Sequence, residues 1–446
     1  MREALKIAVP DSASRSVGAD YPPALTLSRL TLSHFRNHTN LRLDLAPEPV
    51  VLFGPNGAGK TNILEAVSFL ASGRGLRRAR LADVDHQAAS TQTCHPWAVA
   101  AILQNASGMI EIGTGRDASR DASRDASRDA SRDTGGDTSW DASGDLPPEL
   151  SGGALDQEKD GEDEPGSFSR RLVRIDGKMK TPGALDEHVG LLWVTPAMDR
   201  LFTGPSGDRR RFLDQAVGAF DPAHGARLRA YEKALRERSR LLREQSGDSS
   251  WLGALEETMA TQGVALAAAR LEGLARLSPF CGESQGPFPG AVLRLEGEVE
   301  GWLEAMPALA AEEKFIAALK VSRRLDGETG GAACGPHRSD LKVLHGPKGV
   351  AAESCSTGEQ KALLIALVLA SVRLIGMQRG TAPLLLLDEV AAHLDGPRRA
   401  ALFARLCELK LQAWMTGTEA SLFAPLDHSA QFFEISGLGP APVSAQ

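Results

Sequence analysis

The 446 residues are enough for two or three domains, and a content of 42% hydrophobic and 24% charged residues is ordinary for a soluble globular chain. The longest apolar run, 362–377, contains Arg373 and falls short of the ~20 residues of a membrane span, so an integral membrane protein is not expected. The net charge of −7 does not exclude a nucleic-acid partner, because segment 117–165 holds 15 acids and 5 bases and the remainder, with 42 acids and 45 bases, carries +3. The five cysteines form no C-x-x-C pair, which argues against zinc or disulfide frameworks and fits a reducing cytoplasm.

Residues 1–23 are expected to form a flexible extension, and alternating apolar residues over 25–32 and 41–45 predict half-buried strands. Residues 50–53 then predict a buried strand that runs into a phosphate-binding loop, and 62–67 predict the helix that leaves it. The loop consists of Gly54, Pro55, Asn56, Gly57, Ala58, Gly59, Lys60 and Thr61. A helix N-terminus and successive backbone N–H groups bind anions, the lysine reaches the β- and γ-phosphates, and the threonine hydroxyl can hold Mg²⁺. The sequence therefore predicts a nucleoside triphosphate site.

The middle of the chain predicts an insertion and a helical lobe. Segment 117–166 is acidic and of low complexity, with aspartate recurring every four residues, and it has too few apolar side chains to fold. The flanking segments 109–112 and 171–175 predict strands, so the insertion extends from a hairpin tip. From 206 to 277, and again from 302 to 324, the pattern is helical and predicts a short arm or an all-helical lobe.

A second set of candidate site residues lies near the C-terminus. The apolar run 384–387 predicts a buried strand that delivers Asp388 as a Mg²⁺ ligand and Glu389 as the group that polarises the attacking water. Upstream, a short polar segment precedes an apolar helix, about 30 residues before Asp388, which is the place of the signature motif in the ATP-binding-cassette (ABC) superfamily. Its residues are Ser356, Gly358, Glu359 and Gln360, and the first and third of them also form a capping box. Asp395 lies at the position of the D-loop.

The two halves of the site imply a head built from both chain ends, because Lys60 and Asp388 are 328 residues apart. We expect an α/β fold, an ATPase head of the ABC/SMC type with an inserted helical lobe. The predicted parts are the extension 1–23, the head segment 24–205, the lobe 206–325, the head segment 326–436 and a flexible tail, 437–446. No Asn-Lys-x-Asp motif for guanine occurs, which favours ATP over GTP.

Three other functions fit some of these motifs. A transporter-type ABC ATPase subunit carries a histidine near the end of its last core strand, where this chain has Thr416-Gly417-Thr418. A long-armed SMC-type structural protein needs a much longer helical span and a C-x-x-C hook. A scaffold that binds nucleotide without turnover is separated from an ATPase only by an assay.

Further blocks resemble the RecF family of bacterial DNA replication and repair proteins, which are relatives of SMC heads. The resemblance extends from Leu25 to about Phe433. The blocks are Phe35-Arg36-Asn37, the arginine-rich segment 73–78, the segment 204–214, the helix 231–242 and Gly335-Pro336-His337-Arg338. The chain departs from the family pattern at Ser239, where asparagine is usual, at Glu389, where many members have a second aspartate, and in the acidic insertion, which has no counterpart.

The resemblance implies a cytoplasmic ATPase with slow, DNA-stimulated turnover, which uses ATP and Mg²⁺ and dimerises around ATP. It implies binding of duplex DNA at gaps or junctions with single strands, and action with RecO and RecR to load RecA, with no membrane partner. Lys60 and Glu389 are the implied catalytic residues, and Arg36, Asn37 and Asn62 join the nucleotide site.

Arginines supply the candidate DNA contacts, and few aromatic residues are available for base stacking, which favours contact with a duplex backbone. The candidates are Arg74, Arg77, Arg78, Arg209, Arg210 and Arg211. The helix 227–243 carries further arginines, for which internal ion pairs or a solvated face are the alternatives.

Overall fold

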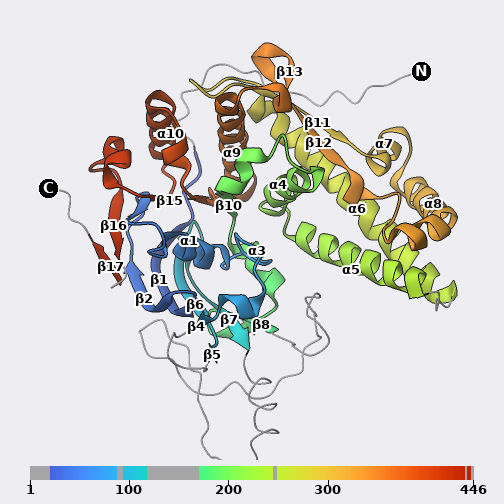
Figure 1. Ribbon diagram of the computed structural model, residues 1–446, viewed down its shortest axis with the longest axis horizontal. Coiled ribbons are helices and arrows are strands. Elements are labelled where there is room, and N and C mark those ends of the chain that lie inside the picture. The colour runs from blue at the N-terminus through green and yellow to red at the C-terminus, as the bar shows by residue number, and fades with distance from the viewer. Residues whose placement is uncertain (1–20, 88–93, 118–169, 245–248, 437–438, 443–446) are drawn as a thin grey trace, which may run out of the picture.

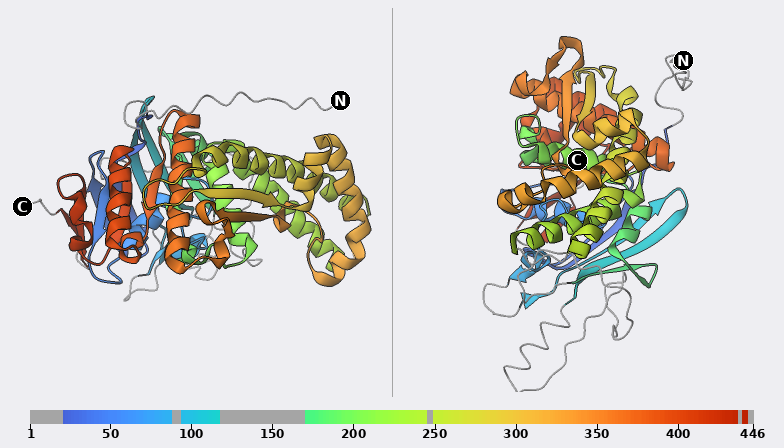
Figure 2. Two further views of the ribbon diagram at one scale, coloured as in Figure 1. Left: turned by 90° about the horizontal axis from the view of Figure 1, so that it is seen from above. Right: turned by 90° about the vertical axis from the view of Figure 1, so that its right-hand side faces the viewer.

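The computed structural model describes residues 21–87, 94–117, 170–244, 249–436 and 439–442 (Figure 1). The predictions for the acidic insertion beyond Asp117 and for both flexible ends fall largely outside these residues. A head of two sheets occupies one side of the molecule, and a helical lobe projects from it, as the view from above shows (Figure 2).

The central sheet of the head joins both ends of the chain. Its strand order is β10-β14-β15-β3-β16-β17, with all neighbours parallel except β17. The bounds are β3 Val50–Phe53, β10 Leu191–Val194, β14 Leu384–Leu387, β15 Ala413–Gly417, β16 Gln431–Ser436 and β17 Gly439–Pro442. Both faces are covered, since Leu384 and Leu386 enter one hydrophobic cluster while Leu385 and Leu387 enter the other. A parallel strand buried on both faces requires an unbroken apolar run, which explains the sequence of β14.

An antiparallel sheet lies below the central one in Figure 1, with helix α1 (Lys60–Ser68) between them. Its order is β2-β1-β6-β7-β8-β9, which confirms the predicted hairpin strands. The bounds are β1 Thr26–Phe35, β2 His38–Asp44, β6 Ala98–Asn105, β7 Gly108–Asp117, β8 Arg170–Ile175 and β9 Lys178–Lys180, and a short hairpin adds β4 His86–Gln87 and β5 Cys94–His95. The rings of Phe35, Phe69 and Trp97 pack against one another in the core between the sheets.

The other face of the central sheet is covered by helices α9 (Thr357–Arg379) and α10 (Gly396–Glu408). Among the described residues, α9 alone is long and apolar enough to cross a membrane, yet 78% of its most apolar window is buried inside the protein. It is therefore accounted for as the core helix of the head.

The helical lobe has different limits from those predicted. Its helices are α5 Pro222–Glu244, α6 Ser249–Cys281, α7 Glu298–Ala305 and α8 Ala308–Thr329, so the predicted boundary at 325 falls inside a helix. Helix α4 (Ser206–Gly218), assigned to the lobe by its pattern, buries Phe212 and Leu213 in the hydrophobic cluster of the head. A small sheet of β11 (Ala291–Glu296), β12 (Asp340–His345) and β13 (Val350–Ala351) joins the two parts.

The end of the predicted N-terminal extension is anchored to the head. The hydroxyl of Tyr21 donates to the carbonyl of Val372 in α9 at 2.9 Å, and its ring packs over Gly376. The carbonyl of Pro23 accepts from the N–H of Ala382 at 2.9 Å. Residues 21–23 therefore belong to the head, and the predicted boundary at 23 is too late.

The Gly-Pro-His-Arg block forms the junction of lobe and head. The carbonyl of Pro336 accepts a 2.6 Å hydrogen bond from Arg270 of α6. The hydroxyl of Tyr231 in α5 lies 2.6 Å from Nδ1 of His337, whose Nε2 lies 3.0 Å from the carbonyl of Ala332. A carbonyl can only accept, so these partners assign the proton to Nε2 and make the tyrosine hydroxyl the donor to Nδ1.

Acid should destabilise the fold through His337. Burial lowers the pKa of this imidazole from 6.5 to about 4, so the unfolded chain binds the proton more readily than the folded one. The stability that the neutral ring contributes is complete above pH 6.5 and is lost as the pH falls toward 4, by about 2 kcal/mol at pH 5. The free energy of unfolding, measured by urea denaturation, should fall between pH 7.5 and pH 5. In His337→Gln this fall should be smaller by about 2 kcal/mol. Equal drops in the two proteins would contradict the assignment.

Candidate functional site

The phosphate-binding loop connects β3 to α1 and needs glycine at two places for packing as well as for backbone conformation. Gly54 has φ 141° and Gly59 has φ 103°, both in the region that disfavours other residues. A Cβ on Gly54 would lie 2.3 Å from the carbonyl oxygen of Ile435, and one on Gly59 would lie 2.5–2.7 Å from the side chains of Asn37 and His38. The loop is therefore pressed between β16 and the β1–β2 turn, with its N–H groups at the start of a helix.

The side chain of Lys60 folds back into the phosphate-binding loop. Its Nζ donates to the carbonyl of Gly54 at 2.7 Å and to that of Pro55 at 2.8 Å, and the residue is only 5% exposed. Burial lowers the pKa of the amine, while the charges of Glu389 and Asp388 act in the opposite direction. A buried ammonium held by carbonyls at the mouth of the loop fits a lysine that binds phosphate oxygens.

Asp388 brings the two ends of the chain together. Its Oδ1 accepts from the hydroxyl of Thr61 at 2.9 Å and from the hydroxyl of Thr416 at 2.8 Å. The Thr416 hydroxyl in turn accepts from the backbone N–H of Glu389 at 2.8 Å, and Glu389 adopts φ 56°. A hydroxyl and a carboxylate facing each other are hard oxygen donors of the kind Mg²⁺ takes, so the predicted metal residues fit that ion. The turn after Asp388 fixes where the Glu389 backbone lies.

The Phe-Arg-Asn block supports the loop from outside. Arg36 forms two hydrogen bonds, of 3.0 and 2.8 Å, with Glu65, a fully buried carboxylate of α1. Asn37 donates to the carbonyl of Ala58 at 3.2 Å and accepts from Asn62 at 2.6 Å. Arg36 thus neutralises a buried charge under the loop, while the two asparagines lie beside it.

The signature segment caps helix α9. The side chain of Ser356 accepts from the N–H of Glu359, and the Glu359 carboxylate accepts from the N–H of Ser356 at 3.0 Å, which is the predicted capping box. An ion pair with Lys348, together with these bonds, lowers the pKa of Glu359 to about 2. Gln360 is buried and donates to the carbonyl of Cys355 at 2.9 Å. Capping therefore orders the N-terminus of α9.

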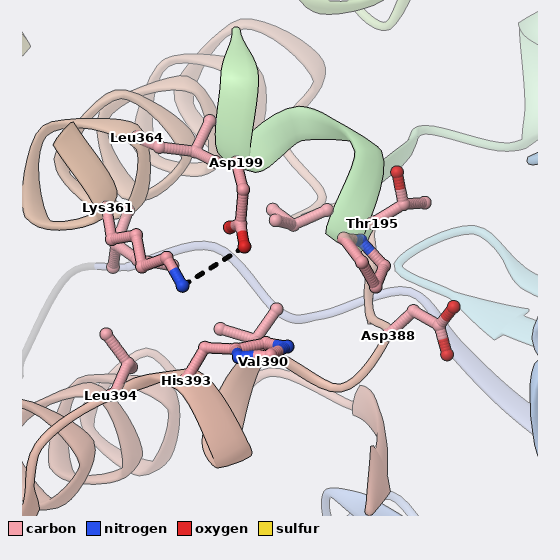
Figure 3. Close-up of a pocket in the computed structure, with 11 residues that line it drawn as sticks. Thr195, Asp199, Lys361, Leu364, Asp388, Val390, His393 and Leu394 are labelled. Atoms are coloured by element: carbon pink, nitrogen blue, oxygen red, sulfur yellow. Dashed lines mark ion pairs between the residues drawn. The ribbon is translucent and has the colours of Figure 1, made fainter. Parts of the chain in front are cut away.

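A cavity lies between α9 and the carboxyl end of β14 (Figure 3). Asp388, Lys361, Asp199 and His393 are among its lining residues. Lys361, the residue after the signature, reaches Asp199 with 3.1 Å between Nζ and Oδ2. This ion pair connects α9 to the short helix after β10, the strand that pairs with β14.

The predicted D-loop residue caps the next helix. Asp395 is the N-cap of α10, and its Oδ1 accepts from the N–H of Arg398 at 2.8 Å. Arg398 also donates to the carbonyl of Gly358 at 3.2 Å. One side chain therefore connects the D-loop helix to the signature segment.

The candidate DNA contacts divide by burial, and one of them is wrong. Arg209 is buried, forms bonds of 2.6 and 2.9 Å to the carboxylate of Asp340 and also donates to three backbone carbonyls, so its guanidinium is not available to phosphate. Arg210 is half-buried and bonded to Ser206 and Ser339. Arg74 is half-buried, whereas Arg77, Arg78 and Arg211 are exposed and remain predictions.

Three residues of the site were missed from the sequence. In the sequence Thr416 stands out only as the residue where a transporter has a histidine, yet in the fold it binds both Asp388 and the Glu389 backbone. His38 places Nε2 3.2 Å from the carbonyl of Gly59. Glu65 carries a usable signal, since a carboxylate on the apolar face of a helix needs a cation; Arg36 at 2.8 Å and Arg77 at 3.4 Å both pair with it.

Comparisons with known proteins agree with this architecture. The family model "RecF/RecN/SMC N terminal domain" matches residues 26–435. The chain is 46% identical to the DNA replication and repair protein RecF of Mesorhizobium japonicum over 417 residues, which are 93% of this chain and 97% of that protein. It is 44% identical to the protein of the same name from Rhizobium rhizogenes over 418 residues, 93% and 98% of the two chains.

A solved structure gives the same fold. It is described as the recombination mediator protein RecF-ATPrS in the RecFOR pathway, has a TM-score of 0.73 at 20% identity, and the match covers 95% of this chain and 100% of that one. The predicted α/β head of the ABC/SMC type is confirmed. The extent and identity of the sequence matches show that the chain belongs to the RecF family of DNA replication and repair proteins.

Proposed function

We propose that the protein is an ATP-hydrolysing molecular switch that dimerises around ATP and Mg²⁺ and binds duplex DNA. The observation that carries the proposal is the contact of Thr61 with Asp388, at 2.9 Å across 327 residues of sequence, beside a buried Lys60. A phosphate loop, a hydroxyl–carboxylate pair and a following glutamate are the parts that phosphoryl transfer to water needs. Relatives named for DNA replication and repair, and a solved neighbour described as RecF-ATPrS, support this proposal.

Each site residue has a separate role in this proposal. Lys60 exchanges its two carbonyl partners for phosphate oxygens, Thr61 and Asp388 hold Mg²⁺, and Glu389 orients and deprotonates the attacking water. Mg²⁺, when bound, neutralises charge on the phosphates. Asn37 and Asn62 contact the nucleotide at the edge of the loop, whereas Arg36 acts through Glu65.

The second subunit completes the site. Ser356, Gly358 and Gln360 begin a helix of 23 residues, whose N-terminal N–H groups suit the γ-phosphate held by the partner. Asp395 caps the neighbouring helix, and Arg398 ties it to Gly358, so D-loop and signature move together at the interface.

The family supports a proposal for the cellular role. We place the protein in the cytoplasm, at gaps and junctions between duplex and single-stranded DNA, where it acts with RecO and RecR to load RecA. The solved neighbour is described as a recombination mediator protein in the RecFOR pathway. A transporter subunit is set aside, because the chain belongs to the RecF family.

A mixing experiment tests the shared site. Lys60→Ala disables the loop and Ser356→Arg disables the signature, so each variant alone should lack ATPase activity. In a 1:1 mixture, random pairing makes half the dimers heterodimers with one intact site of two, and about one quarter of wild-type activity should return. Steady-state phosphate release measures this, with and without DNA, and each variant mixed with itself is the control. No recovery in mixtures that light scattering shows to be dimeric would contradict the shared site.

A further inference from the structure

Helix α5 carries a stripe of positive charge along its outer face. Lys233, Arg236, Arg240 and Arg243 are exposed and follow one another at intervals of three or four residues, so they lie on one side of the helix. The opposite side packs into the lobe through Tyr231, Ala234, Arg238 and Leu241. In Figure 1, α5 is the lowest helix of the lobe, with α6 above it.

Most of these charges are not neutralised within the protein. Among the described residues, no carboxylate forms an ion pair with Lys233, Arg240 or Arg243, and Arg236 lies 4.0 Å from Glu232, at the limit of such a pair. Elsewhere on the same helix the cations are paired closely, as Arg227 is with Asp221 at 2.6 Å. Three carboxylates, Glu232, Glu237 and Glu244, lie on or beside the same face. Glu244 is exposed and the other two are half-buried, so the exposed charge along this face remains mainly positive and suits an anionic partner.

The basic surface continues from the lobe onto the head. Strand β9 exposes Lys178 and Lys180, for which the described part of the chain likewise contains no ion-pair partner, and it leads directly into Pro182–Ala184. That turn touches α5, since a Cβ on Gly183 would lie 3.3 Å from an Nη atom of Arg229. Two elements from different parts of the sequence therefore meet at this turn, and each of them carries exposed cations.

We propose that these cations, Lys178 and Lys180 of β9 and Lys233, Arg236, Arg240 and Arg243 of α5, bind the phosphate backbone of duplex DNA. From Arg229 to Arg243 the α5 stripe covers 15 residues, or about 21 Å of helix, which matches about six base pairs of a duplex. No aromatic side chain lies on the stripe, so it contacts phosphates and does not stack on the bases of a single strand. The inference rests on the proposed DNA binding and gives it a surface.

Salt dependence provides the test, because each lysine or arginine that contacts phosphate releases a counterion. The variant Lys233→Gln/Arg236→Gln/Arg240→Gln should bind a fluorescein-labelled blunt duplex at least about tenfold more weakly near 50 mM salt in the presence of Mg·ATP. The slope of log K against log salt should become shallower by about 2 to 3. Fluorescence anisotropy over a salt series measures both.

A matched variant removes three charges from the exposed face of α8, Lys314→Gln/Lys320→Gln/Arg324→Gln, and should keep the wild-type slope. ATPase activity without DNA should be unchanged in both variants and shows that they fold. An unchanged slope in the α5 variant, an equal loss in the α8 control, or loss of single-strand binding alone would overturn the inference. Wild-type protein that binds no DNA at all would instead overturn the proposed function.

Discussion

Replacing Glu389 with glutamine is expected to lower the rate of ATP hydrolysis by about 10²-fold or more while ATP still binds. The amide keeps the size of the side chain but cannot take a proton from water. The backbone N–H that anchors this residue to Thr416, at 2.8 Å, is unaffected by the change. Lys60, Thr61 and Asp388 remain in place, so binding of a fluorescent ATP analogue should match that of the wild type.

The same variant should accumulate as a dimer with Mg·ATP, because the step that opens the dimer is removed. Light scattering measures the dimer, and steady-state phosphate release measures turnover. Glu408→Gln, an exposed carboxylate at the end of α10, is the control and should behave as wild type. A normal rate in Glu389→Gln would show that another group activates water and that the assignment is wrong.

Replacing Arg238 with methionine is expected to destabilise the helical lobe by about 3–5 kcal/mol. The arginine is fully buried, and its guanidinium bonds to Glu256 at 3.0 Å, to Asp326 at 2.8 Å and to the carbonyl of Leu319 at 2.7 Å. Methionine fills much of the space but leaves the Asp326 carboxylate buried without its cation, and buried unpaired charge is costly.

Urea denaturation followed by far-UV circular dichroism would measure this loss, with Arg236→Met as the matched control on the exposed side of α5. The control should change stability by less than about 1 kcal/mol. Adding Asp326→Asn to the Arg238 variant should restore part of the loss, since it removes the stranded charge. A loss in Arg238→Met no larger than in the control would mean that the charge network contributes little.

The arginines show where reasoning from residue type fails. Arg209, Arg238 and Arg240 lie in arginine-rich segments and look alike as phosphate contacts. In the folded chain Arg209 pairs with Asp340, 131 residues away, and Arg238 pairs with Asp326, 88 residues away, whereas Arg240 is exposed. Helical periodicity separates the two faces of α5, but only the partners on other elements show which face is buried.

The sequence by itself was enough to identify the nucleotide-binding motifs, the functional residues at the ends of the core strands and the family. Each of these depends on a short pattern whose chemistry is local. A glycine-rich loop between strand and helix, and an apolar run that ends in Asp388 and Glu389, carry their meaning within about ten residues. Only the tertiary structure shows that Thr416 forms hydrogen bonds with both residues of this acidic pair and that Arg36 forms an ion pair with the buried Glu65. It also shows where the lobe begins and ends. Those contacts join residues far apart in the chain, and a buried charge takes whichever partner the packing brings within hydrogen-bond distance.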